Sequence, residues 1–212
     1  IVTTNVQFFE SLYSNKGSRC RKLHNMVNSV IVLDEAQMIP LNHMKPCLWA
    51  LAELVINYKA TVVLCTATQP AVKEIIPGGL TPVEIMENPD ELQMIFKRVN
   101  IEYHGYISDE KLAEVIAKNH QVLTIVNTRR HAKILFNKVN EISQKDVYHL
   151  SARMCPAHRK EVINKIREVL KAGSPCRVVS TQLIEAGVDI DFPVVYRAAS
   201  GVDSIAQAAG RC

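Results

Sequence analysis

At residues 29–37 the sequence reads Ser29-Val30-Ile31-Val32-Leu33-Asp34-Glu35-Ala36-Gln37. A short β-branched and apolar run of this kind is typical of a strand buried in a parallel sheet. The next such run is Thr61-Val62-Val63-Leu64-Cys65, and between the two, the stretch from Leu41 to Tyr58 has apolar residues at helical spacing. This strand–helix–strand order predicts an α/β fold with parallel sheets and helices on both of their faces.

The second half of the chain repeats the same alternation. Its apolar runs predict strands at Val122–Val126, Val147–Leu150, Arg177–Ser180 and Val194–Tyr196. Periodicity predicts helices at Asp109–Lys118, Arg130–Ile142 and Pro156–Leu170, the first of them capped by Ser108 or Asp109. Residues 80–106 are mixed in composition, and we expect a connector there with a short strand at Val99–Tyr103.

Composition and charge exclude several classes of protein. Apolar residues make up 48% and charged residues 22% of the chain, which excludes a disordered chain and a collagen-like fibre. Apolar runs are too short for a transmembrane helix. The net charge of +4 is compatible with a polyanionic partner but does not indicate one. The six cysteines form no C-x-x-C pair, so we expect reduced thiols in a cytoplasmic protein and no zinc site.

Parallel sheets bind ligands where their strands end, so the residues that follow each strand are the first functional candidates. Asp34 and Glu35 follow the first strand. One interpretation is a metal–nucleotide site, in which Asp34 holds Mg²⁺ mostly through water and Glu35 deprotonates the attacking water. The alternative is a pair of solvated carboxylates that cap the next helix. Thr66 and Thr68 follow the second strand and allow either hydrogen bonds between functional loops or an ordinary turn.

The strands of the second half are also followed by polar residues. Asn127 and Thr128, with two arginines after them, suit a phosphate site at a helix start, or a simple helix cap with solvated arginines. After the strand at Arg177–Ser180, we expect Thr181 and Gln182 to contact phosphate. Gly187 allows a sharp turn, and Asp189 can follow that turn into a ligand cleft. Arg211, directly after a glycine, suits an arginine finger.

The order of these strings resembles superfamily 2 helicases. Asp-Glu-Ala-Gln at 34–37, Thr-Ala-Thr at 66–68, the stretch Ser180–Asp189 and Gln-Ala-Ala-Gly-Arg at 207–211 resemble motifs II, III, V and VI of that superfamily. Longer strings resemble one branch, the helicase part of the CRISPR-associated helicase-nuclease of type I interference systems. These strings are Ile1–Leu12, Ser180–Phe192, Val194–Ala198 and Ser204–Cys212.

This resemblance implies an α/β protein with two RecA-like parallel-sheet domains of the P-loop NTPase type, the first one incomplete. The domains would span residues 1–105 and 106–212, with ATP and Mg²⁺ between them. The resemblance assigns catalysis to Asp34 (through Mg²⁺), Glu35, Gln37, Gln207 and Arg211. It assigns nucleotide contact to Gly187 and Asp189, and coupling of hydrolysis to movement to Thr66 and Thr68. It places Thr3, Thr4, Asn127, Thr128, Thr181 and Gln182 near nucleic acid.

The resemblance also implies partners, and the sequence departs from the family pattern at one motif. The partners are single-stranded DNA, a guide-RNA surveillance complex and an HD nuclease domain, fused or separate. The sequence holds no Gly-x-x-x-x-Gly-Lys-Ser/Thr string, the motif that cradles ATP phosphates. We therefore expect a segment truncated at both ends and inactive alone. Another superfamily 2 motor, acting on RNA or of the restriction type, and a non-catalytic helicase-fold scaffold stay open as alternatives.

Overall fold

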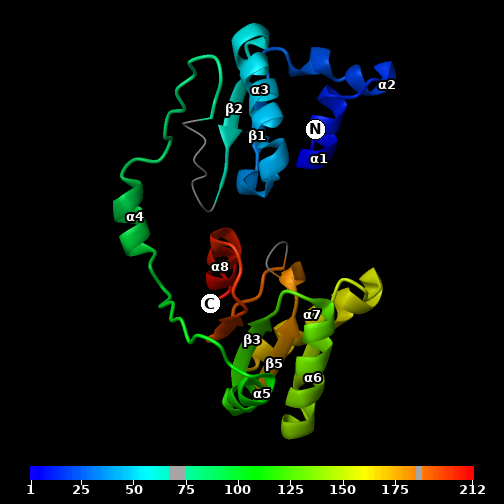
Figure 1. Cartoon of the computed structure of the whole chain (residues 1–212), viewed down its shortest axis with the longest axis vertical. Helices are drawn as coiled ribbons and strands as arrows, with labels where there is room; N and C mark the ends of the chain where they lie inside the picture. Colours follow the sequence, from blue (N-terminus) through cyan, green and yellow to red (C-terminus); the bar gives the residue numbers. More distant parts are fainter. Residues whose placement is uncertain (67–74, 185–187) are drawn as a thin grey trace. The chain divides into compact units, whose positions relative to one another are not determined.

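The computed structural model describes residues 1–66, 75–184 and 188–212, which form two units, Ile1–Pro89 and Asp90–Cys212 (Figure 1). The predicted sites at Thr68 and Gly187 lie outside the described residues. The assignment of helicase domains to residues 1–105 and 106–212 stays a prediction. No helix among the described residues has both the length and the apolar character that a membrane span requires. All six cysteines are free thiols.

The first unit contains a parallel pair of strands, β1 and β2, in register from Val30 opposite Thr61 to Leu33 opposite Leu64. The predicted helix is confirmed as α3, and its bounds are those expected from the sequence. The elements in chain order are α1 (Asn5–Leu12), α2 (Gly17–Cys20), η1 (Leu23–Met26), β1 (Val30–Leu33), η2 (Ala36–Met38), α3 (Leu41–Tyr58) and β2 (Thr61–Leu64).

One face of this two-stranded sheet forms the core of the first unit. Leu33 packs there with α1 and α3, through Phe8, Leu48 and Leu51. On β1, residues alternate between the two faces of the sheet, and Val30 and Val32 are 68% and 60% exposed. Among the described residues, helices therefore cover one face of this sheet and not both.

The second unit is built on four parallel strands in the order β4–β5–β3–β6. This confirms the predicted α/β class with parallel sheets. The elements in chain order are α4 (Pro89–Ile95, from the last residue of the first unit), α5 (Asp109–Lys118), β3 (Gln121–Ile125), α6 (Arg129–Ser143), β4 (Val147–Leu150), α7 (Pro156–Lys171), β5 (Cys176–Ser180), η3 (Gln182–Ile184), β6 (Val195–Arg197) and α8 (Val202–Ala209).

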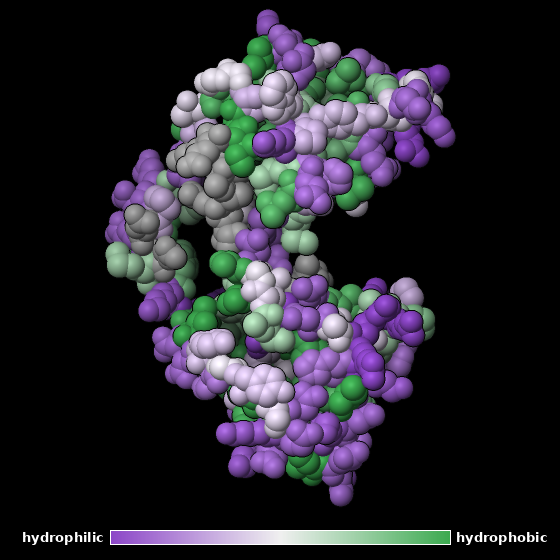
Figure 2. Space-filling model, viewed as in Figure 1, coloured by the Kyte–Doolittle hydropathy of each residue, from purple (hydrophilic) through white to green (hydrophobic). Residues whose placement is uncertain are grey.

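Helices cover both faces of the second sheet. Val122 of β3 packs in one core with α5 and α6, whereas Leu123 and Ile125 pack in another core with Ile166 of α7 and Ala208 of α8. The alternation along β3 sends successive side chains to opposite faces, as a strand covered on both sides requires. The outer surface of α5 and α6 is largely hydrophilic (Figure 2), which fits amphipathic helices that pack on a sheet.

One predicted element is wrong. No strand forms at Val99–Tyr103, where the chain has no regular structure and Ile101 and Tyr103 are exposed. The alternation of side chains there fits a strand, but strands need a neighbour with which to exchange backbone hydrogen bonds, and no described strand pairs with this segment. Helices α1, α2, α4 and α8 are not predicted by the sequence analysis.

Candidate functional site

The acidic loop, defined here as Asp34–Gln37, follows β1 directly. Glu35 adopts a left-handed backbone conformation, with φ 52° and ψ 45°. Its backbone N–H donates to Asp34 Oδ1 over 3.0 Å, and the Gln37 side-chain amide donates to Glu35 Oε2. Asp34 and Glu35 are exposed and Gln37 is half-buried. The loop thus presents two carboxylates to solvent, each already oriented by one hydrogen bond.

The end of β2 supports this loop from the side. The Cys65 N–H donates to the Leu33 carbonyl over 2.9 Å, and the Cys65 carbonyl accepts from the Ala36 N–H over 3.0 Å. Thr66 comes next in the chain and is half-buried. The structure therefore brings the predicted coupling residue Thr66 close to the acidic loop along the backbone, because β1 and β2 end at the same edge of their sheet.

The start of α1 also reaches the acidic loop. The Thr4 hydroxyl caps α1 by accepting from the Gln7 N–H over 3.2 Å, and the Thr3 hydroxyl donates to Gln7 Oε1 over 2.8 Å. Asn5 Nδ2 donates to the Asp34 carbonyl over 3.1 Å. This contact joins residues 29 positions apart, and the sequence reasoning missed it because a side-chain contact of such long range leaves no local signal.

The donor set of the acidic loop fits Mg²⁺ bound together with a nucleotide. Magnesium is usually held by one or two carboxylates plus substrate phosphates and water. Asp34 has carboxylate lone pairs that its single bond to the Glu35 N–H leaves open. No cluster of three or more acidic, histidine or cysteine side chains occurs among the described residues, so this part of the chain offers no all-protein metal cage.

In the second unit, the predicted nucleic-acid residues gather at one edge of the sheet. β3 pairs with β5 and β6 in parallel, so all three strands end there. Asn127 and Thr128 follow β3, and Thr181 and Gln182 follow β5. Thr181 is buried, while Asn127, Thr128 and Gln182 are exposed.

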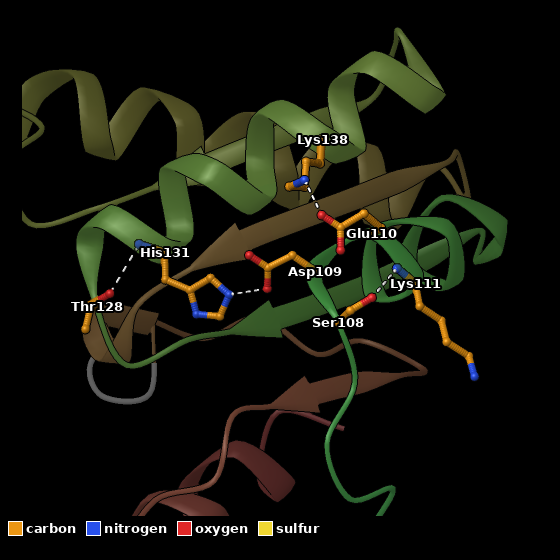
Figure 3. Close-up of polar contacts among 7 residues, drawn as sticks. All are labelled: Ser108, Asp109, Glu110, Lys111, Thr128, His131 and Lys138. Carbon is orange, nitrogen blue, oxygen red and sulfur yellow. Dashed lines mark hydrogen bonds and ion pairs between the residues drawn. The ribbon is translucent and has the colours of Figure 1, made fainter.

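A side-chain cap fixes the start of α6, and two polar links join α6 to α5 (Figure 3). The Thr128 hydroxyl accepts from the His131 N–H over 3.2 Å and so caps the helix. The His131 ring bonds to Asp109 Oδ1 through Nε2 over 2.8 Å. Further along, Lys138 contacts Glu110 over 2.7 Å. These contacts hold the predicted phosphate-binding residue Thr128 in place.

Asn127 has intramolecular partners at both ends of its amide. Its Nδ2 donates to the Ala199 carbonyl over 2.8 Å, and its Oδ1 accepts from Arg197 Nη1 over 2.6 Å. Arg197 also donates to the Ala198 carbonyl over 2.9 Å. Asn127 therefore ties the end of β3 to the loop that leads into α8, a role that the sequence did not indicate.

The remaining predicted residues of the second unit lie at or near α8. Gln207 is on α8 and half-buried, and Arg211 follows the helix end. The Arg211 carbonyl accepts from the Phe192 N–H over 2.8 Å. Asp189 is exposed, and its carbonyl accepts from Arg167 Nε over 3.2 Å. These backbone bonds fix the main chain at Arg211, which is predicted to be catalytic, and at Asp189, which is predicted to contact the nucleotide.

Shifted pKa values in the second unit have structural causes. The hydrogen bond from Lys138 lowers the pKa of Glu110 to about 2. Burial raises the pKa of the Cys176 thiol to about 12, so this thiol stays protonated at neutral pH. Burial, with a smaller effect from Lys133, lowers the pKa of His149. None of these groups is one of the predicted site residues.

Comparison with known proteins finds a family that is similar to most of the second unit. Residues 118–212 match the family described as CRISPR-associated nuclease/helicase Cas3, C-terminal. This part of the chain, just under half of its length, is therefore similar to that family. The match agrees with the resemblance that the sequence strings indicate.

Similar proteins extend the Cas3-like resemblance. A Cas3 of Haloferax volcanii is 55% identical over 38 residues, 18% of this chain and 4% of that protein. The T. fusca Cas3–AMPPNP structure has a TM-score of 0.72 at 17% identity and covers 97% of this chain and 30% of that one. A chain of a CRISPR RNA-guided surveillance complex in its pre-nicking state has a TM-score of 0.67 at 18% identity, covering 96% and 30%. The chain thus spans about a third or less of these relatives.

Proposed function

We propose that this chain is part of an ATP-dependent helicase that moves along single-stranded DNA in CRISPR antiviral defence. The acidic loop carries the proposal. It places Asp34 and Glu35 at the end of a parallel strand, beside the end of β2, in a chain whose second unit is Cas3-like. The Cas3 structure with AMPPNP and the surveillance-complex structure among its relatives support nucleotide binding and a guide-RNA partner.

In this proposal, Asp34 holds Mg²⁺ mainly through water, and Glu35 accepts the proton of the water that attacks the γ-phosphate. When bound, Mg²⁺ supplies charge neutralisation on the transferring phosphoryl group. Gln37 holds the Glu35 carboxylate through the hydrogen bond to Oε2. That bond leaves lone pairs on the carboxylate free to accept from water.

The other predicted residues complete the proposal. Gln207 and Arg211 act on the γ-phosphate, Asp189 and Gly187 contact the nucleotide, and Thr66 and Thr68 couple hydrolysis to movement. Nucleic acid binds at Thr3, Thr4, Asn127, Thr128, Thr181 and Gln182. The exposure of Thr3, Thr4, Asn127 and Thr128 supports this assignment. The buried Thr181 would contribute through its backbone.

The proposal includes a guide-RNA surveillance complex as partner, an HD nuclease domain that is fused or separate, and a cytoplasmic location. Because the sequence has no Gly-x-x-x-x-Gly-Lys-Ser/Thr string, the phosphates of ATP need a cradle that these residues do not supply. We therefore expect the 212 residues alone to be inactive as an ATPase.

The test uses the complete protein that contains this chain. ATP hydrolysis is measured with single-stranded DNA, with single-stranded RNA and with neither, for the wild type, Glu35→Gln and the control Glu53→Gln. Glu53 is an exposed carboxylate on α3, so its substitution makes the same chemical change outside the acidic loop. Glu35→Gln should slow turnover by about 10²-fold or more, the usual contribution of a general base, and Glu53→Gln should not.

Each other outcome identifies an alternative. Stimulation by RNA and not by DNA would indicate an RNA helicase. Turnover that Glu35→Gln leaves unchanged, or no turnover at all in the wild type, would indicate a scaffold that keeps the fold without the chemistry.

A further inference from the structure

The peptide group between Asp34 and Glu35 is held at both of its polar atoms. Its N–H donates to Asp34 Oδ1 over 3.0 Å, and its carbonyl oxygen accepts from Asn5 Nδ2 over 3.1 Å. Rotation of this peptide group would break both bonds. Asn5 is half-buried, and its bond joins α1 to the acidic loop. Asn5 is therefore one of two groups that fix the plane of this peptide.

The plane of that peptide decides where the Glu35 side chain points. Rotation of the peptide changes φ of Glu35, which lies at 52° in the left-handed region. A residue with a Cβ enters this region only when its surroundings hold it there. The next peptide is held as well, because the Ala36 N–H donates to the Cys65 carbonyl over 3.0 Å. Glu35 is thus anchored on one side by Asn5 and on the other by the end of β2.

Asn5 is also continuous with the predicted nucleic-acid segment. It directly follows Thr3 and Thr4, which are exposed. Their hydroxyls bond to the backbone and side chain of Gln7, and the helix is seated in the core of its unit by Phe8 and Phe9. A ligand that displaces the backbone at Thr3 and Thr4 would move Asn5, and Asn5 in turn pulls on the peptide before Glu35.

We infer that Asn5 is a positioning residue through which nucleic acid bound at Thr3 and Thr4 sets the orientation of Glu35. It touches neither ATP nor the attacking water, and it acts through the backbone of the acidic loop. The inference rests on the proposed function, because it concerns the chemistry of Glu35. It assigns to Asn5 a kinetic coupling within the first unit, in which nucleic acid at Thr3 and Thr4 changes kcat through Glu35; unlike coupling between binding affinities, an effect on kcat need not be reciprocal.

The test replaces Asn5 in the complete protein by Ala and by Leu. Leu has nearly the shape of Asn but cannot donate a hydrogen bond, so a shared effect of the two variants reports the lost donor and not lost volume. The control is Asn57→Ala, which removes the bond from Asn57 Nδ2 to Glu53 Oε1 of 2.8 Å elsewhere in the same unit. Each protein is assayed for kcat and KM for ATP with and without single-stranded DNA, for DNA affinity, and for melting temperature.

For both Asn5 variants, kcat with DNA should fall about fivefold, the rate factor that corresponds to one neutral hydrogen bond. The ratio of kcat with DNA to kcat without it should fall as well. KM for ATP and the affinity for DNA should stay within about twofold, because an Asn that only positions Glu35 binds neither ligand. Asn57→Ala should behave as the wild type does.

Three results separate the possible failures. If the wild type hydrolyses ATP without DNA stimulation, or if Glu35→Gln leaves turnover intact, the proposed function fails. If those two tests succeed and both Asn5 variants keep the wild-type ratio, this inference alone is overturned. It is also overturned if activity falls only in step with the melting temperature while the ratio stays unchanged, because that pattern reports a purely structural role.

Discussion

β1 and β3 both lead into a predicted functional loop, but their surroundings differ. β3 lies between β5 and β6 and sends side chains into a core on each face, and its Val122 is fully buried. β1 pairs with β2, and its Val32 is 60% exposed. The loop after β3 therefore follows a strand that is buried on both faces of its sheet. The acidic loop after β1 depends more on individual hydrogen bonds, among them those of Asn5 and Gln37.

The same substitution on both strands gives the largest expected contrast. Val→Thr keeps the shape of the side chain and adds a hydroxyl. At Val122 the hydroxyl enters an apolar core and should cost about 1–3 kcal/mol of unfolding free energy. At Val32 it faces solvent, and the cost should be below about 0.5 kcal/mol. Hydrogen–deuterium exchange of peptides from β3 and β1, with denaturant unfolding of each variant, measures both effects.

Equal losses of unfolding free energy for Val122→Thr and Val32→Thr would contradict the proposed difference between β3 and β1. In particular, a large cost for Val32→Thr would mean that the complete protein buries the second face of β1. A small cost for Val122→Thr would mean that the β3 core accepts a hydroxyl.

A smaller effect is expected at Asn127. Asn127→Ala removes the bonds to the Ala199 carbonyl and to Arg197, and should cost about 1 kcal/mol because these bonds lie at an exposed site. Asn127→Asp keeps an acceptor for Arg197 but sets a carboxylate oxygen against the Ala199 carbonyl, so the contact with Ala199 should be lost in both variants. Exchange of the peptide that spans residues 198–201 reports the loss. If both variants exchange as the wild type does, β3 does not support this loop through Asn127.

The smallest effect concerns pH. Lys138 lowers the pKa of Glu110 from 4.5 to about 2. The unfolded chain takes up this proton first, so the stabilising contribution is present above about pH 4.5 and is lost as the pH falls toward 2. Glu110→Gln should lower the melting temperature slightly at pH 7, and the difference should shrink at pH 3. The control Glu114→Gln makes the same chemical change on the same helix.

The sequence predicts helices and strands best where the local residues show apolar periodicity or a side-chain cap. α3 and α5 have the predicted bounds because each repeats apolar residues at helical spacing, and Ser108 adds a side-chain cap to α5. α1 and α8 are each eight residues long, too short for periodicity to identify. Val99–Tyr103 has the alternation of a strand, but whether a strand forms depends on a neighbour that local sequence cannot reveal.

The candidate site also has features that the local sequence predicts and contacts that it does not. The carboxylates of the acidic loop are recognisable because two charges after an apolar run need an explanation, and the Thr128 cap follows from residue type and position. The contact of Asn5 with Asp34 and that of Asn127 with Ala199 join residues 29 and 72 positions apart. Such contacts follow from how distant segments pack, and nothing in the local sequence indicates these two partners.

The exposed face of β1 has a consequence for biosynthesis. A chain emerges from the ribosome with its N-terminal part first, so Val30 and Val32 are released before any residue of the second unit. Four strands later in the chain complete a sheet with both faces covered. Until the face of β1 is covered, its apolar side chains and unpaired edge offer a template for other nascent chains. Of the described strands, β1 is the one with large exposed apolar side chains, and it is therefore the strand most open to such pairing before the rest of the protein is made.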